Sequence, residues 1–148
     1  MRLERKPLAI SHTAFDESWG RLSPDARWLA YRSNESQRDE IYITPFPGPG
    51  GKRQISLSGG DQPIWRSDGK EIFYLGPDNR LMAAEVNIKG DSPDVGAVGP
   101  LFGPILCGGG YCYDVSADGQ RFLLRTEPEA TSAEPLTLVR NWTAALSK

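Results

Sequence analysis

Polar turns and short apolar runs alternate along this chain, and the same arrangement occurs three times. Each turn contains an aspartate, and the fourth, fifth and sixth residues after that aspartate are apolar or aromatic in all three copies. The three aspartates are Asp25, Asp68 and Asp118, and the runs that follow them are Trp28–Tyr31, Ile72–Leu75 and Phe122–Leu124. Since three matches in register are improbable by chance, the pattern predicts a repeat protein.

The length of the repeat indicates its architecture. Successive turn aspartates lie 43 and 50 residues apart, which fits one four-stranded blade of a β-propeller and is too long for a leucine-rich or ankyrin repeat. Short apolar runs bounded by turn residues are typical of strands. The expected strands are residues 19–22, 27–32, 40–46 and 52–56, then 63–66, 71–75, 81–86 and 98–102, then 111–115, 121–125 and 136–142. Residues 89–99, with Gly90 and Pro93, are expected to form a long loop.

The chemistry of the repeated turn explains its aspartate. A carboxylate at this place accepts hydrogen bonds from backbone N–H groups ahead of it, and a following glycine adopts a positive φ without steric cost. Gly69 and Gly119 follow the second and third aspartates, but Ala26 follows the first. We therefore expect the first turn to be slightly strained, or to be of a type that tolerates alanine.

The whole chain is expected to form one all-β domain, a permuted propeller fragment of about three blades. Residues 1–17 hold the fourth strand of a preceding blade, 18–58 form the first blade, 59–104 the second, and 105–148 a third that lacks its fourth strand. Because propellers have about 4 to 8 blades, three leave the end faces uncovered. We expect a homodimer in which Pro7–Ser11 of each copy adds a strand to the third blade of the other, closing a six-bladed ring. The alternative is that the chain is a piece of a longer one.

Bulk properties limit the partners. A net charge of −2 supplies no basic surface for nucleic acid. No apolar stretch has the length of a membrane span, and the charged start has no apolar core of a signal peptide behind it, so membrane insertion is not expected and the compartment is not indicated.

Cys107 and Cys112 bracket three glycines and a tyrosine, a spacing that permits a small disulfide in an oxidising compartment, with two free thiols as the alternative. Two thiols and one histidine do not supply the four ligands of a zinc site. We expect no metal and no cofactor.

No catalytic motif stands out. The Ser-x-x-Lys match at Ser67–Lys70 lies inside the repeated turn, and there is no Gly-x-Ser-x-Gly segment to present a nucleophile beside His12, the sole histidine. We expect no enzyme activity in this chain.

Ligands of ring-shaped β folds bind near the central channel, so the residues that enter the inner strands are the candidates for ligand binding. Trp19, Gln62 and Cys112 occupy corresponding places in the three copies. The candidate ligand-binding residues are Glu17, Trp19, Asp61, Gln62 and Tyr111. Trp28 and Trp65 fall inside strands, where packing in the core is expected.

The segments Ser33–Ile43 and Pro45–Lys52, and the ending Tyr113–Phe122 with Asn141–Ala144, resemble the TolB-like, WD-related propeller repeats that follow the membrane-spanning segment of many bacterial serine/threonine protein kinases. The resemblance covers nearly the whole chain, with Ala26 and the cysteine pair as departures. It implies a non-catalytic sensor or binding module, outside the cytoplasmic membrane in the parent proteins, with a protein, peptide or carbohydrate ligand. An accessory propeller of a prolyl-oligopeptidase-like hydrolase and a purely structural fragment are the alternatives.

Overall fold

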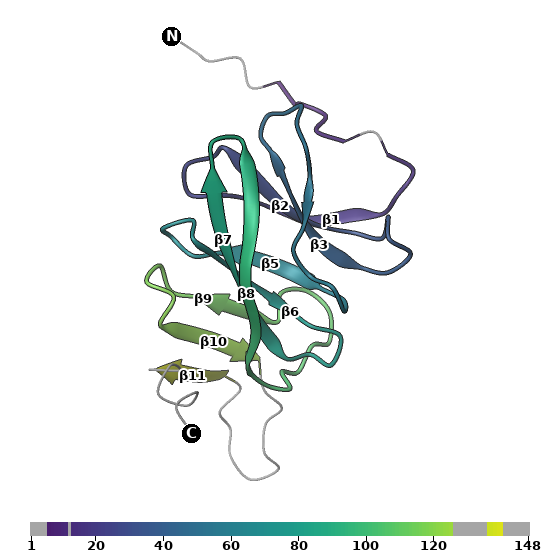
Figure 1. Cartoon of the computed structure of the whole chain (residues 1–148). Coiled ribbons are helices and arrows are strands. Elements are labelled where there is room, and N and C mark those ends of the chain that lie inside the picture. Colours follow the sequence, from purple (N-terminus) through teal and green to yellow (C-terminus); the bar gives the residue numbers. More distant parts are fainter. Residues whose placement is uncertain (1–5, 12, 126–135, 141–148) are drawn as a thin grey trace.

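A computed structural model describes residues 6–11 and 13–125 and the strand 136–140, and in this part of the chain every regular element is a β-strand. The strands form three antiparallel sheets of four, four and three strands (Figure 1). The first sheet contains β1 (Glu17–Leu22), β2 (Trp28–Ser33), β3 (Glu40–Pro45) and β4 (Arg53–Gln54). The second contains β5 (Asp61–Trp65), β6 (Glu71–Leu75), β7 (Leu81–Lys89) and β8 (Ser92–Phe102). The third contains β9 (Tyr113–Val115), β10 (Arg121–Arg125) and β11 (Leu136–Arg140).

Within each sheet the strands follow one another in chain order, so neighbouring strands are antiparallel and consecutive in the sequence. The strands expected from the sequence agree with this arrangement to within a few residues, apart from the segment after β7. The fold is therefore all-β with antiparallel sheets, as predicted, and the three sheets do not close into a ring within the described residues. Residues 6–11 form no strand in the single chain, so their pairing with a second copy stays a prediction. His12 and Trp142 lie outside the described residues.

The expectation of a long loop over residues 89–99 is wrong. These residues belong to a hairpin in which Lys89 pairs with Ser92 and Ala83 pairs with Gly99, and Gly90, with a φ of 64°, makes the tight turn between the two strands. Pro93 is tolerated because β8 is the edge strand of its sheet, where a missing N–H donor breaks no ladder. The turn end of this hairpin extends beyond the other strands of the second sheet toward the first sheet (Figure 1). There, Ile88 and Val95 pack against the core.

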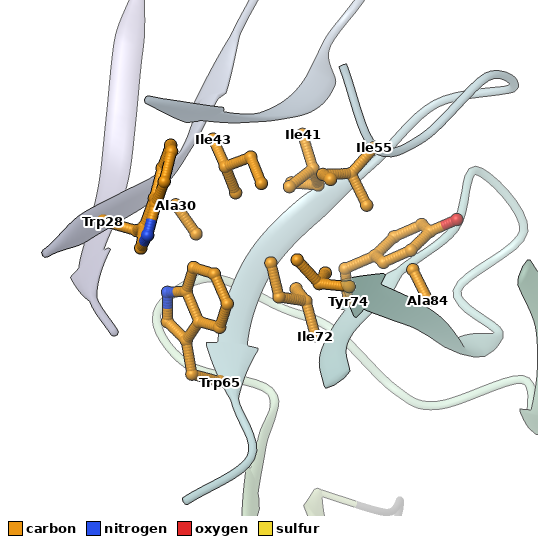
Figure 2. Close-up of a cluster of buried hydrophobic side chains, with 10 residues drawn as sticks. Trp28, Ala30, Ile41, Ile43, Ile55, Trp65, Ile72, Tyr74 and Ala84 are labelled. Atoms are coloured by element: carbon orange, nitrogen blue, oxygen red, sulfur yellow. The ribbon is translucent and has the colours of Figure 1, made fainter. Parts of the chain in front are cut away.

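The sheets stack face to face, with one apolar cluster in each of the two gaps. In the first gap, Trp28, Ala30, Ile41 and Ile43 of the first sheet meet Trp65, Ile72 and Tyr74 of the second (Figure 2). In the second gap, Phe73 and Leu75 meet Phe122 and Leu124 of the third sheet. Trp28 and Trp65 are 2% and 8% exposed, which confirms that both belong to the core.

The stacking follows a rule of alternation, because successive side chains of a strand point to opposite faces. In β6, Ile72 and Tyr74 point to the first sheet while Phe73 and Leu75 point to the third. This is why β6 is a continuous apolar run instead of an alternating one. We call the face of a sheet that meets the following sheet its forward face, and the face that meets the preceding sheet its backward face.

The repeated turns are built as the sequence predicts. Oδ1 of Asp25, Asp68 and Asp118 accepts a hydrogen bond from the N–H two residues further on, over 3.1, 3.0 and 3.0 Å. Ala26 has a φ of 56°, a left-handed conformation that is strained for a residue with a Cβ. The expected strain in the first turn is confirmed.

Candidate functional site

Trp19 and Gln62 occupy equivalent irregularities in the first strands of the first two sheets. In each strand two residues stand opposite one on the neighbouring strand, which is a β-bulge. Trp19 and Gln62 are the first residues of these bulges and have φ values of 59° and 51°. Such angles are unfavourable for residues other than glycine, and where they occur they redirect a side chain.

The two bulged side chains point into different surroundings. Trp19 is half-buried, and its ring meets the edge of Tyr111, with centroids 4.8 Å apart and planes at 73°. The Arg21 guanidinium lies over Tyr111, with its Cζ 4.6 Å from the ring centroid. Contacts of both kinds are favourable, so Tyr111 is held in place although it is 54% exposed.

Gln62 is 3% exposed and its amide is used inside the protein. Its Nε2 donates to the Gly110 carbonyl over 2.9 Å, and its Oε1 accepts from the Cys112 N–H over 2.9 Å. The Tyr113 hydroxyl donates to the Gln62 carbonyl over 2.7 Å, and burial raises the pKa of that hydroxyl well above its ordinary value. Gln62 therefore connects the second sheet to the loop that carries Tyr111.

That loop is closed by a disulfide between Cys107 and Cys112. Gly109 and Gly110 have φ values of 95° and 72°, and these angles allow the chain to turn back within six residues. The bridge and Gln62 together fix both ends of the segment that presents Tyr111.

Asp61 lies beside a different group of charges. Arg32 Nη1 is 3.5 Å from Asp61 Oδ1 and 3.4 Å from Asp39 Oδ2. Burial raises the pKa of Asp61, and the nearby Arg32 cation lowers it in part. Asp61 borders a hollow of about 280 Å³ with Arg38, Pro77 and the glycines of neighbouring loops.

Glu17 lies away from the other four candidates, on the backward face of the first sheet. It accepts a hydrogen bond from the Thr13 hydroxyl over 3.0 Å and lines a hollow of about 430 Å³ with Ile10, Leu29 and Tyr31. Of the five residues selected from the sequence, the structure thus brings Trp19 and Tyr111 together, buries Gln62 beneath them, and places Asp61 and Glu17 elsewhere.

A second hollow of about 430 Å³ lies where the first strands of all three sheets converge. It is lined by Arg21 and Leu22 of β1, Ile64 and Trp65 of β5, and Tyr113 and Asp114 of β9, together with Pro24 and Tyr111. Trp65 fixes two of these strands to each other, because its indole N–H donates to the Arg21 carbonyl over 3.0 Å. The walls are apolar and aromatic, and Arg21 and Asp114 bring one charge of each sign to the rim.

Sequence reasoning missed Arg21 and Asp114. Each lies two residues after an aligned position of the repeat, Arg21 after Trp19 and Asp114 after Cys112. The bulge in β1 decides which of Trp19, Gly20 and Arg21 faces the hollow. A φ value is not visible in a sequence. The alignment of the three repeat copies was the signal for the site in the sequence. It pointed to Trp19 and Tyr111 but not to the charged residues beside them.

The described residues contain no group of three or more His, Cys, Asp or Glu side chains arranged to hold a metal ion. In the same part of the chain, no helix has the length and apolar character needed to cross a membrane.

No family model matches the chain, and a search of curated proteins found no match. Among solved structures, the chain is similar to the crystal structure of TolB from Acinetobacter baumannii, with a TM-score of 0.41 and 18% sequence identity, over 89% of this chain and 43% of that one. The chain thus spans less than half the length of that protein.

Proposed function

We propose that the three sheets are consecutive blades of a β-propeller and that the chain is a non-catalytic binding or sensor module. The order of strands within each sheet and the face-to-face stacking of the sheets support the blade arrangement. The observation that carries the binding function is the hollow at which β1, β5 and β9 converge, with Arg21, Tyr111 and Asp114 at its rim.

The chemistry of this hollow favours an extended peptide as the ligand. β1, β5 and β9 are all edge strands of their sheets, and a peptide in extended conformation can add to such an edge through main-chain hydrogen bonds. The Arg21 guanidinium is planar and always charged, so it suits a carboxylate. Asp114 at the same rim suits a neighbouring basic group. We therefore infer a peptide or protein segment in which acidic and basic side chains lie close together.

Peptide binding tests this function. Labelled peptides that contain one acidic and one basic residue would be compared, by fluorescence anisotropy, with peptides in which the acid is replaced by its amide. We expect the acidic peptides to bind, and Arg21→Gln to weaken binding by about tenfold or more, the effect of losing one hydrogen bond to a charged group. Tyr111→Ala should weaken it as well. Leu57→Ala is the control, since Leu57 is 76% exposed and does not line the hollow.

Two outcomes would contradict the peptide proposal. One is equal affinity of the wild type and the Arg21 and Tyr111 variants for every peptide. The other is displacement of all peptides by oligosaccharides that themselves bind in an Arg21-dependent way, which would assign the hollow to carbohydrate.

The setting in a larger protein is a separate proposal. The sequence resemblance favours the C-terminal part of a kinase-type sensor, and an accessory propeller of a prolyl-oligopeptidase-like hydrolase is the second candidate. The neighbouring coding sequence distinguishes them, because a kinase domain upstream supports the first and a Gly-x-Ser-x-Gly domain downstream supports the second.

We also propose that the chain associates with a second copy through Pro7–Ser11. These residues are exposed and form no strand in the single chain, while β11 is an edge of the third sheet to which a strand can be added.

A further inference from the structure

The two outer faces of the three-sheet stack are of opposite types: one is a backward face and the other is a forward face. At both internal gaps a forward face meets a backward face, as when Phe73 and Leu75 of the second sheet meet Phe122 and Leu124 of the third. Within the described residues, the backward face of the first sheet and the forward face of the third have no sheet against them. A third contact of the same type therefore needs a further sheet, which a second copy of the chain can supply.

The backward face of the first sheet has an apolar centre and an acidic edge. Leu29 and Tyr31 of β2 occupy it, because they alternate with the core residues Trp28 and Ala30. Two carboxylates, Glu17 and Glu35, lie near Tyr31. Burial, followed by the charges of these carboxylates, raises the pKa of Tyr31 to about 12.

The two carboxylates differ in their partners. Glu35 forms an ion pair with Lys52. Within residues 6–11 and 13–125, Glu17 forms no ion pair and accepts a hydrogen bond from the Thr13 hydroxyl. Among the described residues, the Glu17 carboxylate thus leaves one negative charge at the edge of this face without an ion-pair partner.

The described side chains on the forward face of the third sheet carry a net positive charge, because Arg121 and Arg125 outnumber Asp114, which stands opposite Leu123 on the neighbouring strand. Along β10, Arg121, Leu123 and Arg125 are exposed and alternate with the buried Phe122 and Leu124. Leu123 is 43% exposed, which is high for an apolar residue in the middle of a strand. Neither arginine forms an ion pair with a carboxylate that the structure describes, and Arg125 Nη1 donates to the Gly109 carbonyl over 3.4 Å. Along β10 an apolar residue thus lies between two cations, with one carboxylate opposite it on β9, and this face matches an apolar centre beside acidic side chains.

Exposed apolar residues continue from the first sheet into the segment before it. Leu8, Ile10 and Phe15 are 62%, 44% and 46% exposed, and Ile10 lines the hollow on the backward face. An apolar surface of this kind, bordered by charge, is typical of a protein interface.

We propose that the forward face of the third sheet in one copy stacks on the backward face of the first sheet in a second copy, with Arg121 and Arg125 near Glu17 and with Leu123 against Leu29 and Tyr31. This inference rests on the proposed association of two copies and adds the surface that drives it. Two such contacts, related by a two-fold axis, use both end faces of both molecules and leave none uncovered.

Charge exchange between the two faces tests the contact. In the first variant, Arg121→Glu and Arg125→Glu make the forward face acidic. In the second, Glu17→Arg and Thr44→Arg make the backward face basic, since Thr44 lines the same hollow. Like charges brought together across an interface are strongly unfavourable, so each variant alone should raise the Kd of the dimer by at least about 100-fold.

A mixture of the two variants should restore association, because the altered faces match each other and the unaltered faces match as in the wild type. Light scattering after size exclusion should give twice the chain mass of 16.3 kDa for the wild type and for the mixture, and a single chain mass for each variant alone. Lys70→Glu with Lys89→Glu makes the same change in net charge as the first variant but on a different surface, and this control should remain dimeric. Circular dichroism checks that every variant is folded.

Salt and an N-terminal change separate this contact from strand addition. Facing charges are screened by salt, so the wild-type Kd should rise with ionic strength, whereas main-chain pairing is less sensitive. Ile10→Pro removes a backbone N–H donor from the added strand and should weaken the dimer. The mixture of the two charge variants should still associate when both carry this change. A monomeric wild type, an acidic-face variant that stays dimeric, or a mixture that stays monomeric would each overturn the proposal. Peptide binding at the Arg21 hollow is measured separately and fails or succeeds independently.

Discussion

Replacing Glu40 with alanine should be among the most destabilising substitutions in this chain. The Glu40 side chain is fully buried at the start of β3. It accepts hydrogen bonds from the Gly59 N–H over 3.0 Å, from the Ser56 hydroxyl, and from Arg38 Nε over 2.9 Å. Gly59 and Ser56 belong to the segment that leads from the first sheet to the second, so one carboxylate fixes the connection between them.

The expected magnitude follows from the groups that alanine leaves without partners. The buried Gly59 N–H and Ser56 hydroxyl each lose an acceptor, and each loss costs about 1–3 kcal/mol. The ion pair with Arg38 adds under about 1 kcal/mol, because the Arg38 side chain is 57% exposed. The total is about 2–7 kcal/mol, a large share of the roughly 5–15 kcal/mol that stabilises a typical domain.

Urea unfolding followed by circular dichroism measures this loss. Glu40→Gln is the matched variant: it retains the shape and one acceptor oxygen, and should lose about 1–2 kcal/mol. A loss below about 1 kcal/mol for Glu40→Ala, with an unchanged urea slope, would show that the connection between the sheets does not depend on this carboxylate.

Three further predictions concern the turns and the disulfide. Ala26→Gly should raise the free energy of unfolding by about 0.5–1 kcal/mol, because a φ of 56° is strained for alanine; a loss of stability in thermal unfolding would contradict this. The hydrogen bond from Arg66 lowers the pKa of Asp68 from 3.8 to about 2, so the stability it contributes is present above pH 3.8 and is lost as the pH falls toward 2. The stability of Asp68→Asn should therefore change less over that range, and an unchanged pH profile would refute the assignment. Removing the bridge with Cys107→Ser and Cys112→Ser should cost about 2 kcal/mol from the entropy of a short closed loop, and a thiol reductant should produce the same loss in the wild type and none in the variant.

The strands and turns could be predicted because their determinants are local. An aspartate with a hydroxyl or glycine nearby specifies the same hairpin wherever it occurs, and the apolar residues that follow specify a strand. The second half of the long hairpin could not be predicted in this way. Gly90, Pro93 and Gly96 each signal a break, but β8 is held by β7 along most of its length and lies at a sheet edge.

The candidate site was predictable only where the repeat itself located it. Trp19 and Gln62 do occupy equivalent bulges, as their corresponding places in the repeat indicate. Their different surroundings depend on contacts across the chain, since Gln62 is covered by a loop 48 residues further on. Residues that act through such distant contacts carry no local signal, and Arg21 is recognisable only after Tyr111 has been placed beside it.

The alternation of faces also bears on how such a chain can change in length. A further unit inserted between β8 and β9 would present the same two kinds of surface as the second sheet, so the neighbours on either side would need no redesign. Duplication of a unit is then a small evolutionary step. The number of units is limited by the fit between the outer faces of the first and last sheets, and not by the contacts between neighbouring sheets inside the stack.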